Sequence, residues 1–263
     1  MWAYDFMQKA LFGGIIVSTV CGIISVFIIL RRMSFAAHAL GHMGLTGASV
    51  ATLLGINVII GQIVLIGCVS VVAGLIGDKI KKNDLSIGVI LTFILGIGSY
   101  SLFLFQNHYA GSVTAILFGN IFSISTSQIW QLLILALIVI VTMTIITRPL
   151  LFFSVDMITA ESKNVSKKLL SVVFFLVLAI TVSMACQVVG TILVFTLLII
   201  PGAIGVSCGR SFYHILSISI ITANISFVTA LYSAYYYDLP VSFCLTMILC
   251  FLYFISLIKT KFT

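Results

Sequence analysis

Long apolar runs separated by short polar clusters make up most of the chain. The runs lie at about 10–30, 34–56, 58–77, 87–106, 128–147, 169–187, 191–209, 214–236 and 241–258. Each is close to the roughly 20 residues that an α-helix needs to cross the hydrocarbon core of a membrane. The pattern therefore predicts an all-α, polytopic membrane helix bundle of about eight or nine transmembrane helices.

The charged residues fall between these runs. The clusters are Arg31 with Arg32, Asp78 to Asp84, Arg148 to Lys168, Arg210, and Lys259 with Lys261. The stretch 107–127 is too interrupted by polar residues and glycine for a full span, and we interpret it as external or re-entrant. Because no linker or low-complexity segment divides the chain, a single domain over 1–263 is expected.

The basic residues also predict an orientation. If residues 1–9 lie outside the cell, twelve of the basic residues fall inside and Lys9 alone falls outside. Because positively charged loops are retained in the cytoplasm, we expect an extracytoplasmic N-terminus and a cytoplasmic C-terminus.

Composition excludes a water-soluble protein. Apolar residues make up 62% of the chain and charged residues only 7%, and its mean hydropathy is +1.31. The net charge of +7 is a topology signal rather than evidence for nucleic-acid binding, since no soluble basic face is available. The six cysteines form no C-x-x-C pair and read as small buried hydrophobic residues.

Two histidines stand inside one apolar run. His38 and His42 lie among alanines, glycines and serines after Arg32. On a helix this spacing places both imidazoles on one face about one turn apart, so they can share a ligand. They would lie about 9 and 15 Å from Arg32 along the axis, near the middle of a core about 30 Å thick. Imidazole pairs favour transition metals, so the pair is a candidate metal site.

The same residues also fit a structural interpretation. A neutral histidine can hydrogen-bond a neighbouring helix, and small residues around it can serve helix packing. Two histidines are an incomplete coordination shell, which leaves positions to water or to a second subunit. Ionisable groups at this depth are costly and are functional candidates by default. Spacing alone leaves both interpretations open.

A helix break or kink is expected in the run 191–209. Pro201 removes one helix hydrogen bond, and Gly202 permits close approach of another backbone. Transport proteins place such breaks at their pathways, which makes both residues candidates for a pathway. The alternative is a kink that only helps packing.

The longest polar run covers about 154–168. It contains Asp156, Met157, Ile158, Glu161 and Ser162. Asp156 can begin a helix, and Met157 and Ile158 offer apolar contact, so a short interfacial helix that docks a cytoplasmic partner is one interpretation. A solvated connection between two spans is the other.

No motif for nucleotide hydrolysis is present. The chain has no G-x-x-x-x-G-K-[ST] loop, so any ATP-driven transport must rely on the ATPase of a partner. A membrane enzyme using the histidine pair as a metal site would need a general base or further ligands, which the sequence does not offer. A non-transporting scaffold would need no histidines in mid-membrane.

Four short stretches, in order, resemble one known family. They are Arg31 to Phe35, Leu54 to Asn57, Leu117 to Asn120 and Leu197 to Pro201. The chain resembles the integral-membrane permease of bacterial ABC-type zinc, manganese and iron uptake systems, the metal ABC-3 family, over nearly its whole length. The resemblance implies a permease fold like that of the vitamin B12 importers, built as one permease domain.

The resemblance also implies roles for particular residues. After R-R-M-S the family typically reads G-D-x-L-x-H, and its Asp and His are implicated in handling the metal. Here His42 falls on the His position and His38 replaces the Asp. Imidazole in place of carboxylate removes a negative charge and a hard oxygen ligand, which favours zinc over manganese or iron. The ATPase-docking segment of the family corresponds to about 154–166, where Ile158 and Ser162 replace its usual Ala and Gly.

The implied assembly is a homodimer in the bacterial plasma (inner) membrane. Its expected partners are a cytoplasmic ATP-binding subunit and an extracytoplasmic metal-binding protein, besides membrane lipid, with no nucleic acid. The expected function is ATP-driven import of a divalent transition metal ion, zinc first, without a permanently bound cofactor or catalytic residues. The alternatives are a diverged protein of the same fold with lost or altered metal specificity, or a metal-dependent membrane enzyme.

Overall fold

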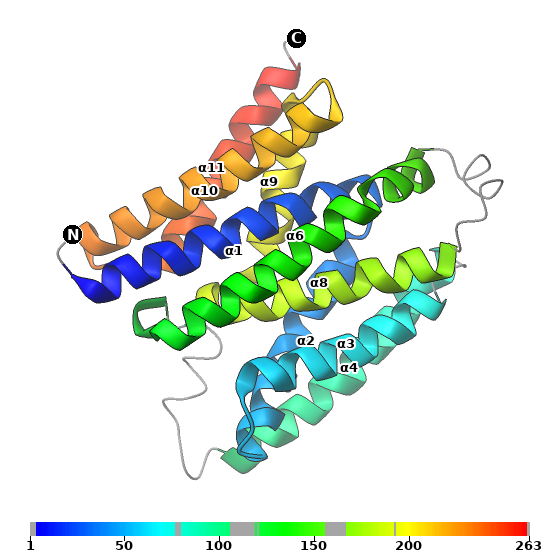
Figure 1. The fold of residues 1–263 in the computed structure, drawn as a ribbon, viewed down its shortest axis with the longest axis vertical. Helices are drawn as coiled ribbons and strands as arrows, with labels where there is room; N and C mark the ends of the chain where they lie inside the picture. Colours follow the sequence, from blue (N-terminus) through cyan, green and yellow to red (C-terminus); the bar gives the residue numbers. More distant parts are fainter. Residues whose placement is uncertain are drawn as a thin grey trace.

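The computed structural model describes residues 4–76, 80–105, 119, 121–155, 167–191 and 193–261, and these ranges contain helices and turns but no strand. In chain order the elements are α1 (Asp5–Leu30), α2 (Ser34–Leu53), α3 (Val58–Ile76), α4 (Ile80–Phe105), the 3₁₀ turn η1 (Ile121–Ser123), α6 (Thr126–Val155), α8 (Lys167–Val189), α9 (Val194–Cys208), α10 (Phe212–Tyr237) and α11 (Val241–Lys261). Every predicted apolar run corresponds to one α-helix (Figure 1), which confirms the all-α bundle.

Several helix boundaries differ from the sequence-based expectation. Helices α1 and α4 begin at Asp5 and Ile80, earlier than the predicted residues 10 and 87. Helix α6 continues through Pro149 to Val155, although the run was expected to end at residue 147. Helix α9 begins at Val194 instead of residue 191, because the chain first turns at Gly190, whose φ of 90° suits glycine. The longer α6 adds a further stretch of helix beyond the apolar run.

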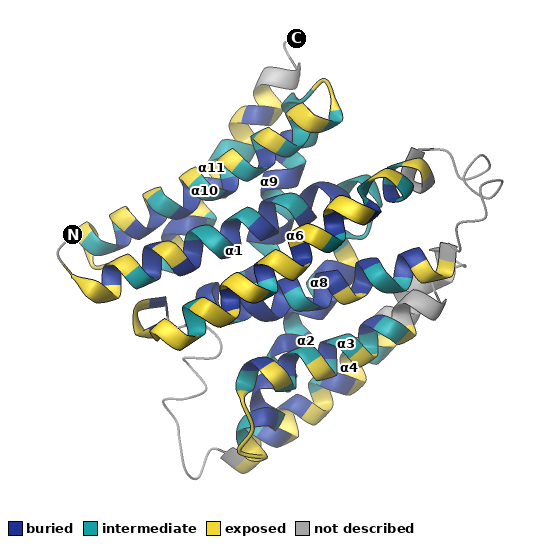
Figure 2. Ribbon diagram, in the orientation of Figure 1, coloured by how far each residue is buried: buried dark blue, intermediate teal, exposed yellow. Residues whose placement is uncertain are grey.

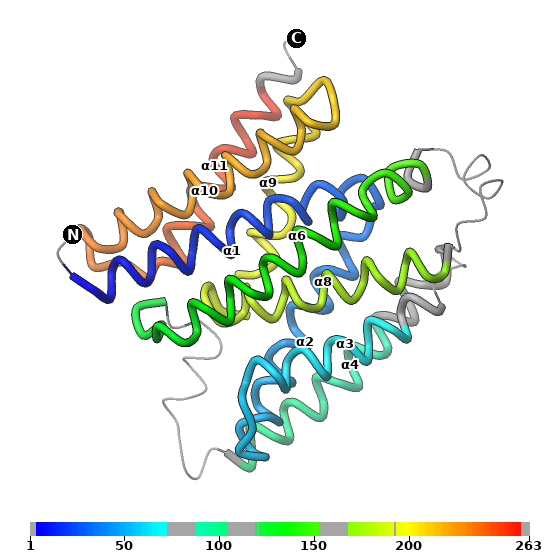
Figure 3. Tube along the Cα trace, viewed as in Figure 1, coloured from blue at the N-terminus to red at the C-terminus, as the bar shows by residue number. Residues whose placement is uncertain are grey.

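The helices form three neighbouring groups (Figures 1 and 3). Helices α1, α6 and α8 contact one another in the middle of the molecule. Helices α9, α10 and α11 pack together on one flank and reach the middle group through α1. Helices α2, α3 and α4 form the other flank, which joins the middle mainly through α3 and α8.

Burial separates internal helices from peripheral ones. Within the described residues, five helices are long and apolar enough to cross a membrane, namely α1, α6, α8, α10 and α11. About two thirds of the apolar window of α1 and of α8 is buried, against 22% for α6 and for α11. Figure 2 shows the corresponding exposed stripe along α6. Because these exposed side chains are large and apolar, their solvent is lipid, and the chain is a multi-pass membrane protein.

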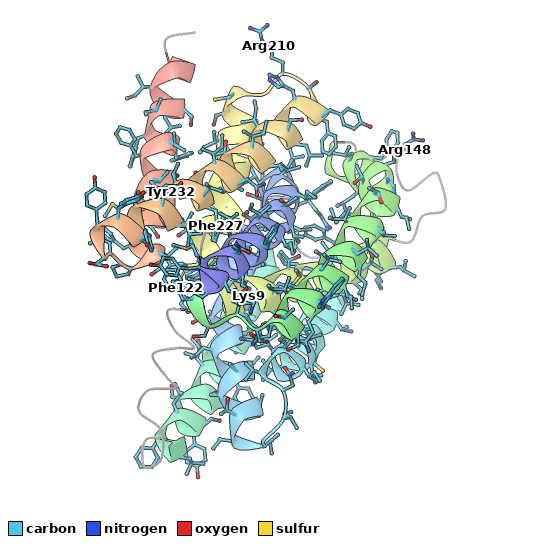
Figure 4. All side chains as sticks on the ribbon, turned by 60° about the vertical axis from the view of Figure 1, so that its left-hand side comes forward. Lys9, Phe122, Arg148, Arg210, Phe227 and Tyr232 are labelled. Atoms are coloured by element: carbon cyan, nitrogen blue, oxygen red, sulfur yellow. The ribbon has the colours of Figure 1, made fainter. Side chains whose placement is uncertain are left out.

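Labelled basic residues lie toward both ends of the bundle. Arg148, near the end of α6, and Arg210, between α9 and α10, lie toward one end, whereas Lys9 and Phe122 lie toward the other (Figure 4). Which end faces the cytoplasm stays a prediction. The predicted docking residues Asp156, Met157, Ile158, Glu161 and Ser162 lie outside the described residues.

Candidate functional site

Helix α2 carries both candidate histidines and is enclosed by protein. It has 20 residues, yet it is not among the five helices that qualify as spans by length and composition. Twelve of its residues are buried, against α3, α4, α8 and α9. Its small residues allow this close packing: a Cβ on Gly47 would lie 2.8 Å from the Cα of Gln62. A helix too polar for lipid is thus accommodated because other helices surround it.

The histidines form a compact ring cluster with one aromatic residue. The centroids of the His38 and His42 rings are 4.5 Å apart, and the rings are almost perpendicular. The His38 ring also meets the edge of Phe195 from α9, again with centroids 4.5 Å apart. Both histidines are half-buried. The predicted one-turn pairing on a shared face is therefore present, and His38 also contacts α9.

One nitrogen of this cluster has no partner. The Nδ1 atom of His38 is buried and makes no hydrogen bond with the described part of the chain. An unpaired buried polar atom is destabilising, and such atoms in native proteins often mark a ligand or water position. Because a metal–imidazole bond is only about 2.0–2.1 Å long, two rings this close can bring one nitrogen each to a common ion.

The coordination shell around the pair is open. Among the described residues, no group of three or more His, Cys, Asp and Glu side chains stands together as a metal site. The pair therefore offers two imidazoles and leaves the other positions to groups from elsewhere, such as water. Open shells of this kind suit a bound species that must exchange.

Helix α9 is continuous at Pro201, so of the predicted kink or break the break is absent. The helix runs from Val194 to Cys208 with the proline inside it. Ser25 of α1 bonds the backbone on both sides of the proline: its hydroxyl accepts a hydrogen bond from the Gly202 N–H at 2.7 Å and donates one to the Ile199 carbonyl at 3.2 Å. A hydroxyl from a neighbouring helix thus supports the backbone where proline removes a donor.

Gly202 makes this contact possible. A Cβ at this position would lie 2.5 Å from the backbone carbon and oxygen of Ser25. Pro201 and Gly202 are buried against α1, and His38 meets the same helix at Phe195, six residues before Pro201. Helix α9 therefore links the histidine pair to α1.

Comparison with known proteins gives the family. The family model of the ABC 3 transport family matches residues 3–260. The chain belongs to the ABC 3 transport family. Two curated relatives have transport names: the manganese transport system membrane protein MntC of Listeria monocytogenes is 29% identical over 96% of this chain and 90% of its own length, and a probable iron transport system membrane protein of Haemophilus influenzae is 27% identical over 98% and 95%.

A solved structure agrees with this assignment. The PsaBC complex of Streptococcus pneumoniae, solved with a Fab, contains a chain that superposes with a TM-score of 0.84 at 26% identity, covering 96% of this chain and 91% of that one. The described helices of this ABC 3 transport protein thus follow the architecture of an experimentally determined relative. The fold expected from the resemblance is confirmed.

Sequence reasoning missed several residues that the fold brings to this region. Phe195 is an ordinary apolar residue in the printed sequence, and nothing about it indicates contact with His38. Ser25 lies 177 positions from Gly202. Gln62 carried a detectable signal, since it is a lone amide inside the apolar helix α3. Of Phe195, Ser25 and Gln62 in this ABC 3 transport protein, only Gln62 could have been chosen as a candidate residue from the sequence.

Proposed function

We propose that this chain is the membrane-spanning permease subunit of an ATP-driven importer of divalent transition metal ions. The observation that carries the proposal is the His38–His42 pair on α2, a helix enclosed by protein, in which the buried Nδ1 of His38 has no partner among the described residues. Ionisable groups kept at this depth indicate a pathway or site rather than packing alone. The names of the curated relatives, manganese and iron transport proteins, support metal as the cargo.

The proposed assembly follows the family. Two copies of the chain form the pathway, a cytoplasmic ATP-binding subunit drives it, and an extracytoplasmic metal-binding protein delivers the ion. The end that carries Arg148 and Arg210 faces the cytoplasm of a bacterial inner membrane, because basic loops stay inside. The segment from Asp156 to Ser162 docks the ATP-binding subunit, and Pro201 with Gly202 shapes α9 beside the pathway.

Zinc is the proposed preferred ion, ahead of manganese and iron. Manganese prefers carboxylate, carbonyl and water oxygens, whereas imidazole binds zinc well and zinc lies above both rivals in the general affinity order. The pair His38 and His42 offers nitrogen at both positions, where the family pattern has a carboxylate at the first. Here the chemistry of the residues, and not the name of a relative, sets the preference.

The test is metal accumulation in cells that produce the complete transport system. A double variant, His38→Ala with His42→Ala, should lower the initial rate of radioactive zinc uptake roughly tenfold or more, because losing the ligands costs more than about 1.4 kcal/mol. Its amount in the membrane should equal that of the unmodified protein. The matched control is His214→Ala, which removes an exposed histidine in the first turn of α10. Undiminished uptake by the double variant would reject the metal role of the pair.

A further inference from the structure

Phe195 is a large apolar side chain that α9 places against the histidine pair of α2. Its ring lies edge-to-face with the ring of His38: the centroids are 4.5 Å apart and the ring planes make an angle of 73°. His38 makes the same kind of contact with His42, at 4.5 Å and 88°. This separation is at the short end of the range of about 4.5–7 Å that is typical of such pairs. The His38 ring therefore stands in close contact with a ring on either side.

The orientation of the His38 ring depends on contacts other than a hydrogen bond at Nδ1. A histidine that binds a metal is usually oriented by its second nitrogen, which donates to a carboxylate, a backbone carbonyl or water. The buried Nδ1 atom of His38 has no such partner among the described residues. Edge-to-face contact is also directional, because the positive edge of one ring meets the negative face of the other. The contact with Phe195 can thus take the place of the missing hydrogen bond.

The packing around Gly41 holds Phe195 and His38 in register. Val194, the residue before Phe195, is fully buried, and a Cβ on Gly41 would lie 3.9 Å from its side chain. Helix α8 also meets α2 at this point, because the thiol of Cys186 donates to the Gly41 carbonyl at 3.9 Å. Gly41 lies three residues after His38, less than one turn away. Because α2 contacts both α8 and α9 here, the backbones that carry the two rings are fixed relative to each other.

The contact suits an imidazole at position 38 and not the aspartate of the family pattern. An aspartate is shorter and has no ring, so Phe195 could not pack edge-to-face with it. Phe195 and His38 therefore fit each other as a pair. The contact supports a nitrogen ligand at this position, in line with the proposed preference for zinc over manganese.

We infer that Phe195 is a positioning residue of the proposed metal site, whose ring contact holds the His38 imidazole in the orientation in which it shares an ion with His42. The inference rests on the proposed function, because it concerns the same histidine pair. Phe195 has no polar side-chain atom and offers the ion no ligand, so it acts through the imidazole. A ligand that is already oriented loses less conformational freedom when the ion binds, so this contact raises the affinity for the ion.

The first test measures zinc uptake in cells that produce the complete transport system. Phe195→Leu removes the ring but keeps an apolar side chain, and we expect the zinc concentration for half-maximal uptake to rise about fivefold, equivalent to about 1 kcal/mol, with little change in maximal rate. Phe195→Tyr retains the ring and should stay within about twofold of the unmodified protein. The matched control is Phe212→Leu, which changes a half-buried phenylalanine whose ring meets Phe27 at 5.7 Å. A half-maximal concentration in Phe195→Leu equal to that of the control would overturn the inference.

The second test follows the histidine rings of the full chain in detergent by NMR. The chain has four histidines, so a ¹³C label at the imidazole Cε1 gives few resonances, which single His→Ala variants assign. Without zinc, Phe195→Leu should move the His38 resonance most, because the ring current of Phe195 is lost. Added Zn²⁺ should shift the His38 and His42 resonances together, with a Kd about fivefold higher in Phe195→Leu than in the unmodified chain. Equal Kd values in the two proteins would reject the positioning role.

The outcomes separate this inference from the proposed function. If Zn²⁺ shifts the His38 and His42 resonances with the same Kd in both proteins, the metal role of the pair stands and the positioning role of Phe195 fails. If Zn²⁺ shifts neither resonance in the unmodified chain, the metal role itself fails. Membrane abundance and the thermal midpoint are measured for each variant, so that loss of folded protein is not interpreted as loss of zinc binding.

Discussion

Two regions of the molecule use small residues in opposite ways. One is the junction of α1, α9 and α10, and the other is the surroundings of α2. At the junction the polar groups that meet across helices are paired: Ser25 bonds α9 on both sides of Pro201, and Ser219 donates to the carbonyl of Gly22 at 2.7 Å. Around α2 the same close packing leaves His38 Nδ1 and Gln62 Oε1 without partners among the residues that the structure describes. Small residues alone therefore do not separate the two regions; they differ in whether the polar atoms at these close contacts are paired.

Asn224 of α10 forms a further group of hydrogen bonds between α1 and α10. Its amide side chain bonds Ser18 at 2.9 Å and Thr19 at 3.1 Å, and also donates to the carbonyl of Ile220. Within a membrane such pairs contribute modestly, about 0.6 kcal/mol on average, because alternative partners exist in the unfolded state. Several of them along one helix pair nevertheless hold α1 and α10 in register.

A larger side chain at the contact between α1 and α9 should give the largest loss of stability among these predictions. Gly202→Ala places a methyl group 2.5 Å from the backbone of Ser25, so α1 and α9 must separate. We expect a loss of about 2–3 kcal/mol, from overpacking and the disturbed Ser25 hydrogen bonds, seen as a lower midpoint of thermal unfolding in detergent. The matched control is Gly96→Ala in α4, whose Cβ meets nothing within 4 Å. Equal stability of the two variants would show that the junction does not depend on this contact.

Changing the first histidine should alter the second region without altering the fold. His38→Asp restores the carboxylate of the family pattern, and we expect the ratio of manganese to zinc uptake to rise about tenfold, equivalent to about 1.4 kcal/mol, because manganese prefers oxygen ligands. Competition between the two ions in uptake assays measures this ratio. The thermal midpoint should stay within the range of the control variants. An unchanged ratio would mean that His38 does not select the ion.

Removing one hydroxyl should give the smallest effect of the three. Ser25→Ala deletes the two hydrogen bonds beside Pro201 and should cost about 1 kcal/mol, the typical net contribution of a hydrogen bond. Ser226→Ala is the comparison, since its hydroxyl is fully buried and has no partner in the described structure. That change should be neutral or slightly stabilising. A Ser25 variant as stable as the Ser226 variant would remove the distinction between paired and unpaired groups on which the comparison depends.

Much of the architecture could be predicted from the printed chain, and the failures have local causes. Every apolar run became a helix, because a chain in lipid must satisfy its backbone internally wherever it is apolar. The end of α6 was placed too early, since Arg148 and Pro149 look like a stop signal but the helix continues through them. The start of α9 was placed too early because the glycine turn at Gly190 cannot be distinguished from the apolar residues around it.

The candidate site was also only partly predictable from the sequence. The spacing of His38 and His42 was sufficient to predict a shared face, because four residues make about one turn of any helix. The sequence around Phe195, Ser25 and Cys186 does not indicate that they lie near α2 and its histidines, since each belongs to a helix distant in the chain. Their contribution depends on how α1, α8 and α9 pack around α2.

By itself the sequence determined the solvent, the helices and the spacing of the histidine pair, because hydropathy and helical periodicity act over a few residues. Tertiary structure alone decided which polar atoms are paired. Whether Ser25 meets Gly202, or the Oε1 atom of Gln62 lacks a partner among the described residues, depends on contacts between segments far apart in the chain. The difference between a paired and an unpaired polar group is therefore set by packing and is not determined by any single stretch of sequence.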